Sequence, residues 1–164
     1  AVIEGRPLMH RIVTVTGDAI KEPRNFMVKI GTNYHELIEE AGGFSKEPKK
    51  IISGGPMMGF GIFDLDVPAT KASSALLCLT KDDVAESKPS ACINCGMCVE
   101  VCPGRVLPAR LADFAEHYDK EKFVAYNGME CCDCGCCSYV CPAKRHLTQS
   151  IKSMRRMILA DKKK

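Results

Sequence analysis

Apolar and polar residues alternate in short stretches over the first half of the chain. Residues 11–16 are rich in β-branched side chains and lead into Gly17-Asp18, a combination typical of a strand followed by a turn. Residues 26–30 place Phe, Val and Ile at alternate positions, which indicates a second strand and hence a hairpin. Apolar stretches at 50–53 and 75–79 predict two further strands.

One amphipathic helix is predicted between these strands, over residues 33–42. Asn33 is its expected N-cap, Gly42-Gly43 its stop, and His35 should lie on its outer face. Its apolar positions recur with helical spacing at Tyr34, Leu37, Ile38 and Ala41. A hairpin, a helix and further strands within about eighty residues favour a small α+β domain of the β-grasp type.

Helical periodicity dominates after residue 107. Pro108 opens one helix, a shorter one is expected over 120–126 before Asn127-Gly128, and a third follows Pro142. The apolar positions of the first and third helices are Leu111, Phe114, Ala115 and Tyr118, and Leu147, Ile151, Met154 and Ile158. The opposite face of the third helix carries Lys152, Arg155 and Arg156, which we expect to be solvated.

The polar, proline-containing stretch at 80–91 is the best candidate for a linker. It predicts a β-grasp domain over 1–80 and a mainly helical domain over 81–164. Within the first domain, residues 54–61 contain four glycines and a proline. They lack both the dinucleotide glycine order and the Walker lysine, so a turn that lets backbone segments pack closely is favoured over a phosphate cradle.

A repeated cysteine motif organises the second half of the chain. The spacing C-x2-C-x2-C-x3-C-P occurs at 92–103 and again at 131–142. This is the spacing of bacterial two-cluster ferredoxins, in which the cysteine before the proline ligates the other cluster. We therefore expect two 4Fe–4S clusters, one held by Cys92, Cys95, Cys98 and Cys141 and the other by Cys131, Cys134, Cys137 and Cys102.

Zinc and disulfides account for the cysteines less well. A structural zinc site needs only four ligands, and the histidines at 10, 35, 117 and 146 are not in metal-ligand spacing with one another. Disulfides suit small secreted chains, whereas eleven cysteines without a signal peptide indicate a reducing compartment. Three cysteines fall outside the repeated spacing and are expected not to be ligands, Cys78 as a small core residue and Cys132 and Cys136 as neighbours of ligands.

Composition excludes several classes of function. A net charge of +3, with no interleaving of basic and aromatic residues, argues against a nucleic-acid partner. No apolar run approaches the roughly 20 residues of a membrane span, so no transmembrane segment is expected. The chain begins at Ala1 without an initiator methionine, which suggests a fragment or a processed form.

Six stretches together resemble the C subunit of the Rnf electron-transport complex, and the likeness covers nearly the whole chain. They are Val-Thr-Val-Thr-Gly-Asp (13–18), Gly-Gly-Pro-Met-Met-Gly (54–59), Val-Pro-Ala-Thr-Lys (67–71), Ala-Cys-Ile-Asn-Cys-Gly-Met-Cys (91–98), Leu-Pro-Ala-Arg-Leu (107–111) and Cys-Ser-Tyr-Val-Cys-Pro (137–142). The resemblance implies a β-grasp domain of the soluble-ligand-binding kind followed by a helical two-cluster ferredoxin domain. The run of extra cysteines at 131–137 departs from the first motif and leaves the ligands of the second motif less secure.

The resemblance also implies a function. Members of this family move electrons between ferredoxin and NAD in a membrane complex that transports sodium ions or protons. The implied partners are the other subunits and a ferredoxin-type carrier, and the implied location is peripheral, on the cytoplasmic face of the membrane. The family's FMN- and NAD-binding domain lies upstream of the part that this chain resembles.

Three functions therefore compete. The first is an electron relay through two 4Fe–4S clusters, with no bond-making chemistry of its own. The second is a ligand-binding or subunit-docking module whose clusters are only structural. The third, a self-contained oxidoreductase, lacks a dinucleotide-binding motif in the sequence.

Overall fold

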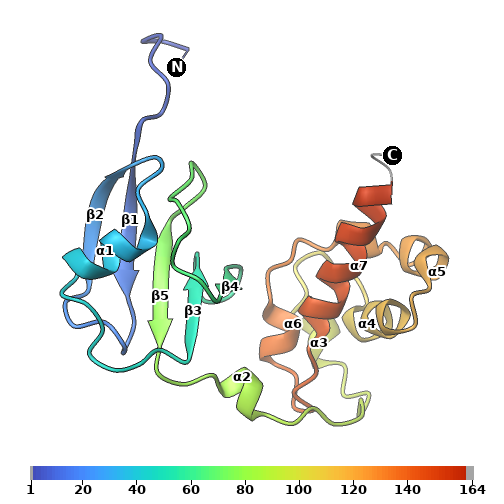
Figure 1. Cartoon of the computed structure of the whole chain (residues 1–164). Helices are drawn as coiled ribbons and strands as arrows, with labels where there is room; N and C mark the ends of the chain where they lie inside the picture. The colour runs from blue at the N-terminus through green and yellow to red at the C-terminus, as the bar shows by residue number, and fades with distance from the viewer. Residues whose placement is uncertain (1, 162–164) are drawn as a thin grey trace. The chain divides into compact units, whose positions relative to one another are not determined.

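The chain folds into two compact units, seen in a computed structural model that describes residues 2–161. The first unit comprises Ala1–Asp83 and the second Val84–Lys164. Strands dominate the first unit and helices the second, with the short helix α2 (Asp83–Glu86) at their junction along the chain (Figure 1). The expected α+β class is confirmed.

The first unit contains a mixed sheet of five strands (Figure 1). They are β1 (His10–Thr16), β2 (Arg24–Lys29), β3 (Lys50–Ser53), β4 (Phe60–Ile62) and β5 (Ala75–Leu79). Their order in the sheet is β2-β1-β5-β3-β4. Only the central pair, β1 and β5, runs parallel, and the other pairs are antiparallel. The parallel central pair is joined through the intervening helix and strands, as a β-grasp arrangement requires.

Helix α1 (Tyr34–Glu40) supplies the apolar layer of this unit. Asn33 caps it, because its side-chain oxygen accepts a hydrogen bond from the His35 N–H at 2.9 Å. The His35 side chain is exposed, as expected. The helix and sheet share one core, whose fully or almost fully buried members include Val13, Val15, Leu37, Ile38, Leu76 and Cys78.

Tyr34 adds a polar contact to this core. Only 1% of its surface is exposed, and its hydroxyl lies 2.9 Å from Ser53 Oγ and 2.8 Å from Ser73 Oγ. Ser53 ends β3 and Ser73 precedes β5, so one hydroxyl ties the helix to two neighbouring strands. This satisfies three buried hydroxyl groups together, which a core of this size requires.

The glycine-rich stretch forms the tight turn that was predicted. A Cβ on Gly59 would lie 2.5 Å from Gly55 O, and Gly59 N–H donates to that same oxygen at 2.8 Å. Gly54 adopts a φ of +106°, which favours glycine. The turn ends sooner than expected, because β4 at Phe60–Ile62 already pairs with β3. This strand was not predicted.

The second unit is built from short helices around one long helix. They are α3 (Met97–Glu100), α4 (Pro108–Glu116), α5 (Lys120–Ala125), the 3₁₀ turn η1 (Gly128–Glu130), α6 (Cys136–Tyr139) and the long α7 (Leu147–Asp161). The predicted apolar face of α7 is confirmed, since Leu147, Ile151, Met154 and Ile158 are all buried. These residues form a core with Leu111 of α4 and Phe123 of α5.

Two expectations for this unit were wrong. Tyr118 was placed on the apolar face of α4, but the helix ends at Glu116 and Tyr118 is 70% exposed with a left-handed φ of +58°. Arg155 was expected to be solvated on α7. Instead only 21% of its side chain is exposed, because it forms an ion pair with Asp133.

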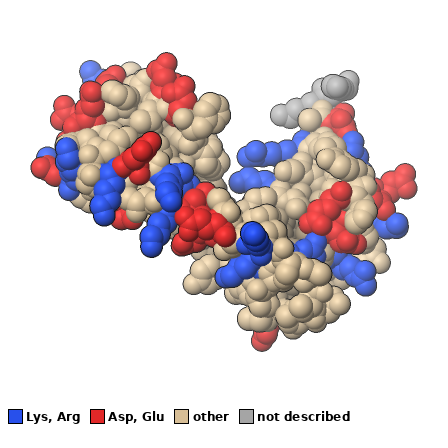
Figure 2. Space-filling view, turned by 60° about the horizontal axis from the view of Figure 1, so that its bottom comes forward, with Lys and Arg blue, Asp and Glu red and all other residues tan. Residues whose placement is uncertain are grey.

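Lys and Arg side chains are interspersed with Asp and Glu on each unit, as Figure 2 shows for one face. In the part of the chain that the structure describes, no helix combines the length and the apolar character needed to cross a membrane.

Candidate metal centre

The two cysteine motifs fold into loops with nearly the same backbone. Gly96 and Gly135, at φ/ψ of 79°/−13° and 84°/−10°, immediately precede α3 and α6. Two residues earlier, Asn94 and Asp133 have left-handed φ values of 56° and 57°. Asn and Asp tolerate this conformation better than other residues with a Cβ. The repeated sequence therefore gives a repeated loop that ends in a single helical turn.

The first set of predicted ligands surrounds one cavity. This cavity has a volume of about 420 Å³ and is lined by Cys92, Cys95 and Cys98 of the first motif together with Cys141 of the second. Cys98 is buried and Cys141 half-buried, whereas Cys92 and Cys95 are exposed. This cavity is therefore open on the side of the first loop.

The second set surrounds a smaller cavity of about 20 Å³. It is lined by Cys131, Cys134 and Cys137 of the second motif together with Cys102 of the first. Each of these thiols is half-buried or buried. Cys132, which was expected not to be a ligand, is exposed but also contributes to this lining. The lining of each cavity thus includes the three predicted ligands of one motif and the pre-proline thiol of the other.

The donor chemistry fits 4Fe–4S clusters, which are held by four cysteine thiolates each. Within residues 2–161, no three His, Cys, Asp or Glu side chains are gathered where a single metal ion could bind. A 4Fe–4S cluster requires a different arrangement, because each iron binds its own cysteine thiolate and the four cysteine sulfurs lie around the cluster. The lining of each cavity includes the four thiols that such a cluster would need. Which thiolate binds which cluster stays a prediction.

Burial controls the protonation of three of these thiols. It raises the pKa of Cys98, Cys131 and Cys137 above the ordinary value for cysteine, because a low-dielectric environment disfavours the thiolate. A bound metal reverses this preference by stabilising the deprotonated sulfur. These positions therefore favour neutral thiols until a cationic iron centre is present.

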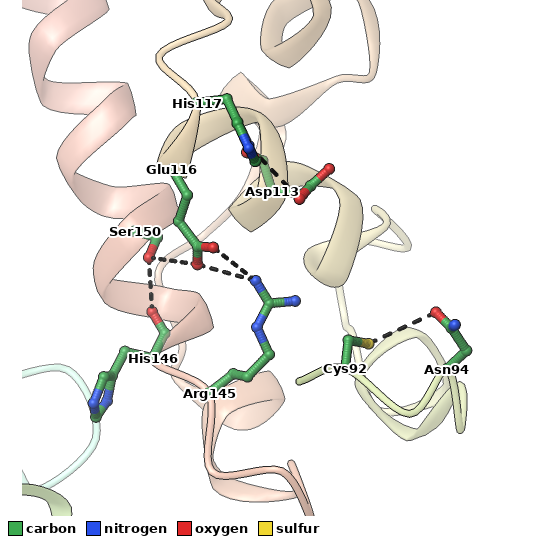
Figure 3. Close-up of polar contacts among 8 residues, drawn as sticks. All are labelled: Cys92, Asn94, Asp113, Glu116, His117, Arg145, His146 and Ser150. Carbon is green, nitrogen blue, oxygen red and sulfur yellow. Dashed lines mark hydrogen bonds and ion pairs between the residues drawn. The ribbon is translucent and has the colours of Figure 1, made fainter. Parts of the chain in front are cut away.

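The first cavity has a charged rim from α4 and from the segment before α7. Arg110, Asp113 and Arg145 contribute to its lining. Arg145 Nη2 donates to both carboxylate oxygens of Glu116, at 2.9 and 3.0 Å, and this arrangement is visible in Figure 3. Near the opening, Cys92 Sγ lies 3.7 Å from Asn94 Oδ1. Charge and polarity therefore surround the more exposed cavity.

The second cavity is instead lined by residues of α7 and of the start of α4. Val106, Pro108 and Ile151 give it apolar walls. Thr148 Oγ1 lies 3.4 Å from Cys137 Sγ and accepts a hydrogen bond from Ser138 Oγ at 2.9 Å. Ser138 Oγ in turn accepts from the Thr148 N–H at 2.9 Å, which satisfies a backbone donor in the first turn of α7. The hydroxyl pair thus fixes the start of α7 against the cysteine loop.

The sequence prediction missed these supporting residues. Arg145 and Thr148 have no recognisable spacing from the cysteines, although both lie just beyond the second motif. The lining of the two cavities, over the described residues, includes no histidine.

Two family models match the chain. Residues 12–61 match the SLBB domain, and residues 91–144 match the 4Fe-4S dicluster domain. The second match contains all eight predicted ligands and identifies a domain with two 4Fe–4S clusters, as expected.

The chain is also similar to curated proteins along its sequence. It is 48% identical over 164 residues to the C subunit of the Na(+)-translocating ferredoxin:NAD(+) oxidoreductase complex of Acetobacterium woodii, covering 100% of this chain and 37% of that protein. It is 50% identical over 157 residues to the C subunit of the proton-translocating ferredoxin:NAD(+) oxidoreductase complex of Clostridium ljungdahlii, covering 94% and 34%. A 41% identity over 128 residues relates it to the C subunit of the ion-translocating oxidoreductase complex of Yersinia enterocolitica, covering 77% and 18%. The chain therefore spans about a third or less of the length of these relatives.

Proposed function

Because the chain belongs to the family formed by the C subunits of ion-translocating (Rnf-type) oxidoreductase complexes, we propose that it relays single electrons through two 4Fe–4S clusters. The observation that carries this proposal is the pair of cavities, whose linings each include the four thiols of one predicted crossed set, with Cys132 as an additional cysteine at the second. The clusters supply one-electron chemistry when bound, and the chain supplies their ligands and their surroundings.

Cys92, Cys95, Cys98 and Cys141 would hold the first cluster, and Cys131, Cys134, Cys137 and Cys102 the second. Cys132 and Cys136 would not be ligands, because the repeated spacing is complete without them. The second site is the more buried, and the Thr148 hydroxyl lies 3.4 Å from Cys137 Sγ. Hydrogen bonds, net charge and solvent exposure all shift cluster potentials. The two clusters would therefore differ in potential although their loops share a backbone.

Within a whole complex, the chain would pass electrons between a ferredoxin-type carrier and a flavin and NAD site. The flavin and NAD would bind in a part of the C subunit that lies outside this chain, consistent with the 37% of the Acetobacterium protein that it covers. Its partners would be other subunits, and it would lie peripherally on the cytoplasmic face of the membrane. Residues 1–80 and 81–164 would act as separate modules.

An anaerobic assay of iron, sulfide and EPR tests the relay. We expect the reconstituted chain to contain about eight irons and eight acid-labile sulfides, because each set of four thiolates supports one four-iron cube. Dithionite should make both clusters paramagnetic, and NADH alone should reduce neither. Tightly bound zinc without a brown chromophore would contradict the proposal, and so would stoichiometric reduction by NADH without another enzyme.

The SLBB match supports a second candidate, in which the first unit binds a ligand or another subunit and the clusters are structural. Clusters that are present but cannot be reduced reversibly would favour this candidate over the relay.

A further inference from the structure

An ion pair joins the second cysteine loop to α7. Arg155 Nη1 donates to Asp133 Oδ1 at 2.8 Å, and about a fifth of each side chain is exposed. Asp133 lies between Cys131 and Cys134 in the sequence, so this pair is part of the loop that carries three proposed ligands. The contact therefore places a guanidinium next to the second cluster site.

The position of Arg155 on α7 supports this placement. Thr148, Ile151 and Arg155 follow one another at i, i+3 and i+7, so they share a helix face. Thr148 and Ile151 line the second cavity, and Arg155 lies one turn beyond Ile151. Burial is the main cause that raises the pKa of Cys131, and the positive charge of Arg155 acts in the opposite direction, as expected for a cation close to that sulfur.

One donor of Arg155 remains unused. Its Nε is a buried atom without a hydrogen-bond partner among residues 2–161. A buried N–H of a charged group that lacks an acceptor is costly, so such groups are rarely left unpaired in proteins. A sulfur atom of an iron–sulfur cluster is an acceptor that this site would gain on loading.

The first cysteine loop provides an internal comparison. Asn94 occupies the position equivalent to Asp133, with φ values of 56° and 57°. The first loop is thus neutral where the second carries a carboxylate and its arginine partner. The difference is confined to side chains, because the backbone is nearly the same.

We propose that Arg155 sets the reduction potential of the second cluster, by neutralising Asp133 and by offering its Nε–H to a cluster sulfur. Reduction adds one electron, and therefore one negative charge, to the cluster. A nearby positive charge favours the reduced form, whereas an uncompensated Asp133 would oppose it. This inference rests on the proposed electron relay. Arg155 is a residue that tunes the cluster and is not one of its ligands.

Replacement of Arg155 by glutamine removes the charge and leaves Asp133 unpaired. We expect the equilibrium constant for reduction of one cluster to fall about tenfold. For a one-electron couple this corresponds to a reduction potential that is about 59 mV lower. The matched control is Arg156→Gln, which removes the same charge from an exposed neighbouring position and should have little effect because solvent screens it. Both are measured by EPR redox titration of the reconstituted full chain, with iron content determined in parallel.

Asp133→Asn tests the sign. It removes the negative charge and keeps Arg155, so the same titration step should move to higher potential. Asn94→Asp adds a negative charge to the first cysteine loop and should lower the potential of the other titration step. The two variants together therefore assign each titration step to one of the two clusters. If the ion pair had a purely structural role, Arg155→Gln and Asp133→Asn would both retain less iron, and they would not shift the reduction potential in opposite directions.

The inference would be overturned if Arg155→Gln moved neither step more than Arg156→Gln does, or if Arg155→Gln and Asp133→Asn moved the step in the same direction. If Arg155→Gln cannot retain iron, the proposal is tested with Arg155→Lys and Asp133→Asn instead. Arg155→Lys keeps the charge but not the Nε–H, so it should shift the reduction potential in the direction expected for Arg155→Gln, but by less. A titration step whose potential stays unchanged or falls in Asp133→Asn refutes the proposal. Failure of the relay itself would be distinct, since the wild-type chain would then lack two reducible clusters.

Discussion

Replacement of Tyr34 by phenylalanine should destabilise the first unit and leave the clusters unaffected. The change keeps the ring, which is 1% exposed, but removes the hydroxyl that lies 2.9 Å from Ser53 Oγ and 2.8 Å from Ser73 Oγ. Ser73 Oγ also accepts a hydrogen bond from the Thr70 N–H at 2.9 Å, so it keeps a partner. Ser53 is 7% exposed and loses the contact that satisfies it.

The expected loss follows from these contacts. Each neutral hydrogen bond contributes about 1 kcal/mol net, and a buried hydroxyl left unpaired costs about 1–3 kcal/mol. Because one of the two serines retains a partner, we expect the free energy of unfolding to fall by about 2 kcal/mol. Anaerobic urea denaturation of the full chain, followed by far-UV circular dichroism, measures this change.

Ser53→Ala provides the matched control. It removes the group that would be left unpaired, so the double variant Tyr34→Phe/Ser53→Ala should lose less stability than the sum of the single variants. A loss below about 0.5 kcal/mol in Tyr34→Phe would refute the reasoning from burial. Loss of iron in this variant would instead contradict the proposal that residues 1–80 and 81–164 act as separate modules.

Three further predictions concern individual positions. Burial raises the pKa of Cys78 from 9.0 to about 11, so iodoacetamide should not label this thiol in the native protein at pH 8. Since the folded-state pKa is the higher one, the contribution of Cys78 to stability should be complete below pH 9 and decline toward pH 11, which a comparison with Cys78→Ala measures. Gly128→Ala should destabilise the second unit by about 1–3 kcal/mol in the same denaturation assay, because the added Cβ would lie 2.4 Å from the Phe123 ring, and an unchanged midpoint would contradict this. Cys102→Ser should first lower the iron bound at the second motif, whereas Cys132→Ser should retain all of it; the reverse result in an iron assay would show that the wrong thiolates were chosen.

Long periodic segments were predictable because their environment is encoded locally. The four apolar positions of α7 are one helical turn apart and all of them are buried. The capping role of Asn33 could be predicted for the same reason, since its bond to His35 N–H spans two residues. The β-branched and apolar runs gave strands close to β1, β3 and β5.

Elements that depend on a distant partner were not predictable in this way. Phe60–Ile62 forms a strand only because it pairs with β3, and its central Gly61 has no strand preference of its own. The left-handed turn at Tyr118 ends α4 before its apolar pattern does. Arg155 looked like a solvated base because its partner, Asp133, lies 22 residues away.

The cysteines that line the two cavities could be predicted because the spacing within each motif determines where the loop places them, whereas their role as ligands stays a prediction. Their surroundings were not, since α7 reaches the second cavity through tertiary packing. For Cys102 and Cys141, the spacing had to be combined with the crossed ligation known from two-cluster ferredoxins. In the structure each of them lines the cavity of the opposite motif.

This exchange of one thiol has a consequence for the order of events during synthesis. Residues 92–102 leave the ribosome well before residue 141, yet neither cavity can be enclosed by its full set of thiols until Cys141 and the loop at 131–137 have emerged. A chain stalled or cut between the motifs would carry four cysteines in the correct spacing and still complete neither site. Cofactor insertion is therefore expected to begin only after the second motif, up to Cys141, has emerged from the ribosome.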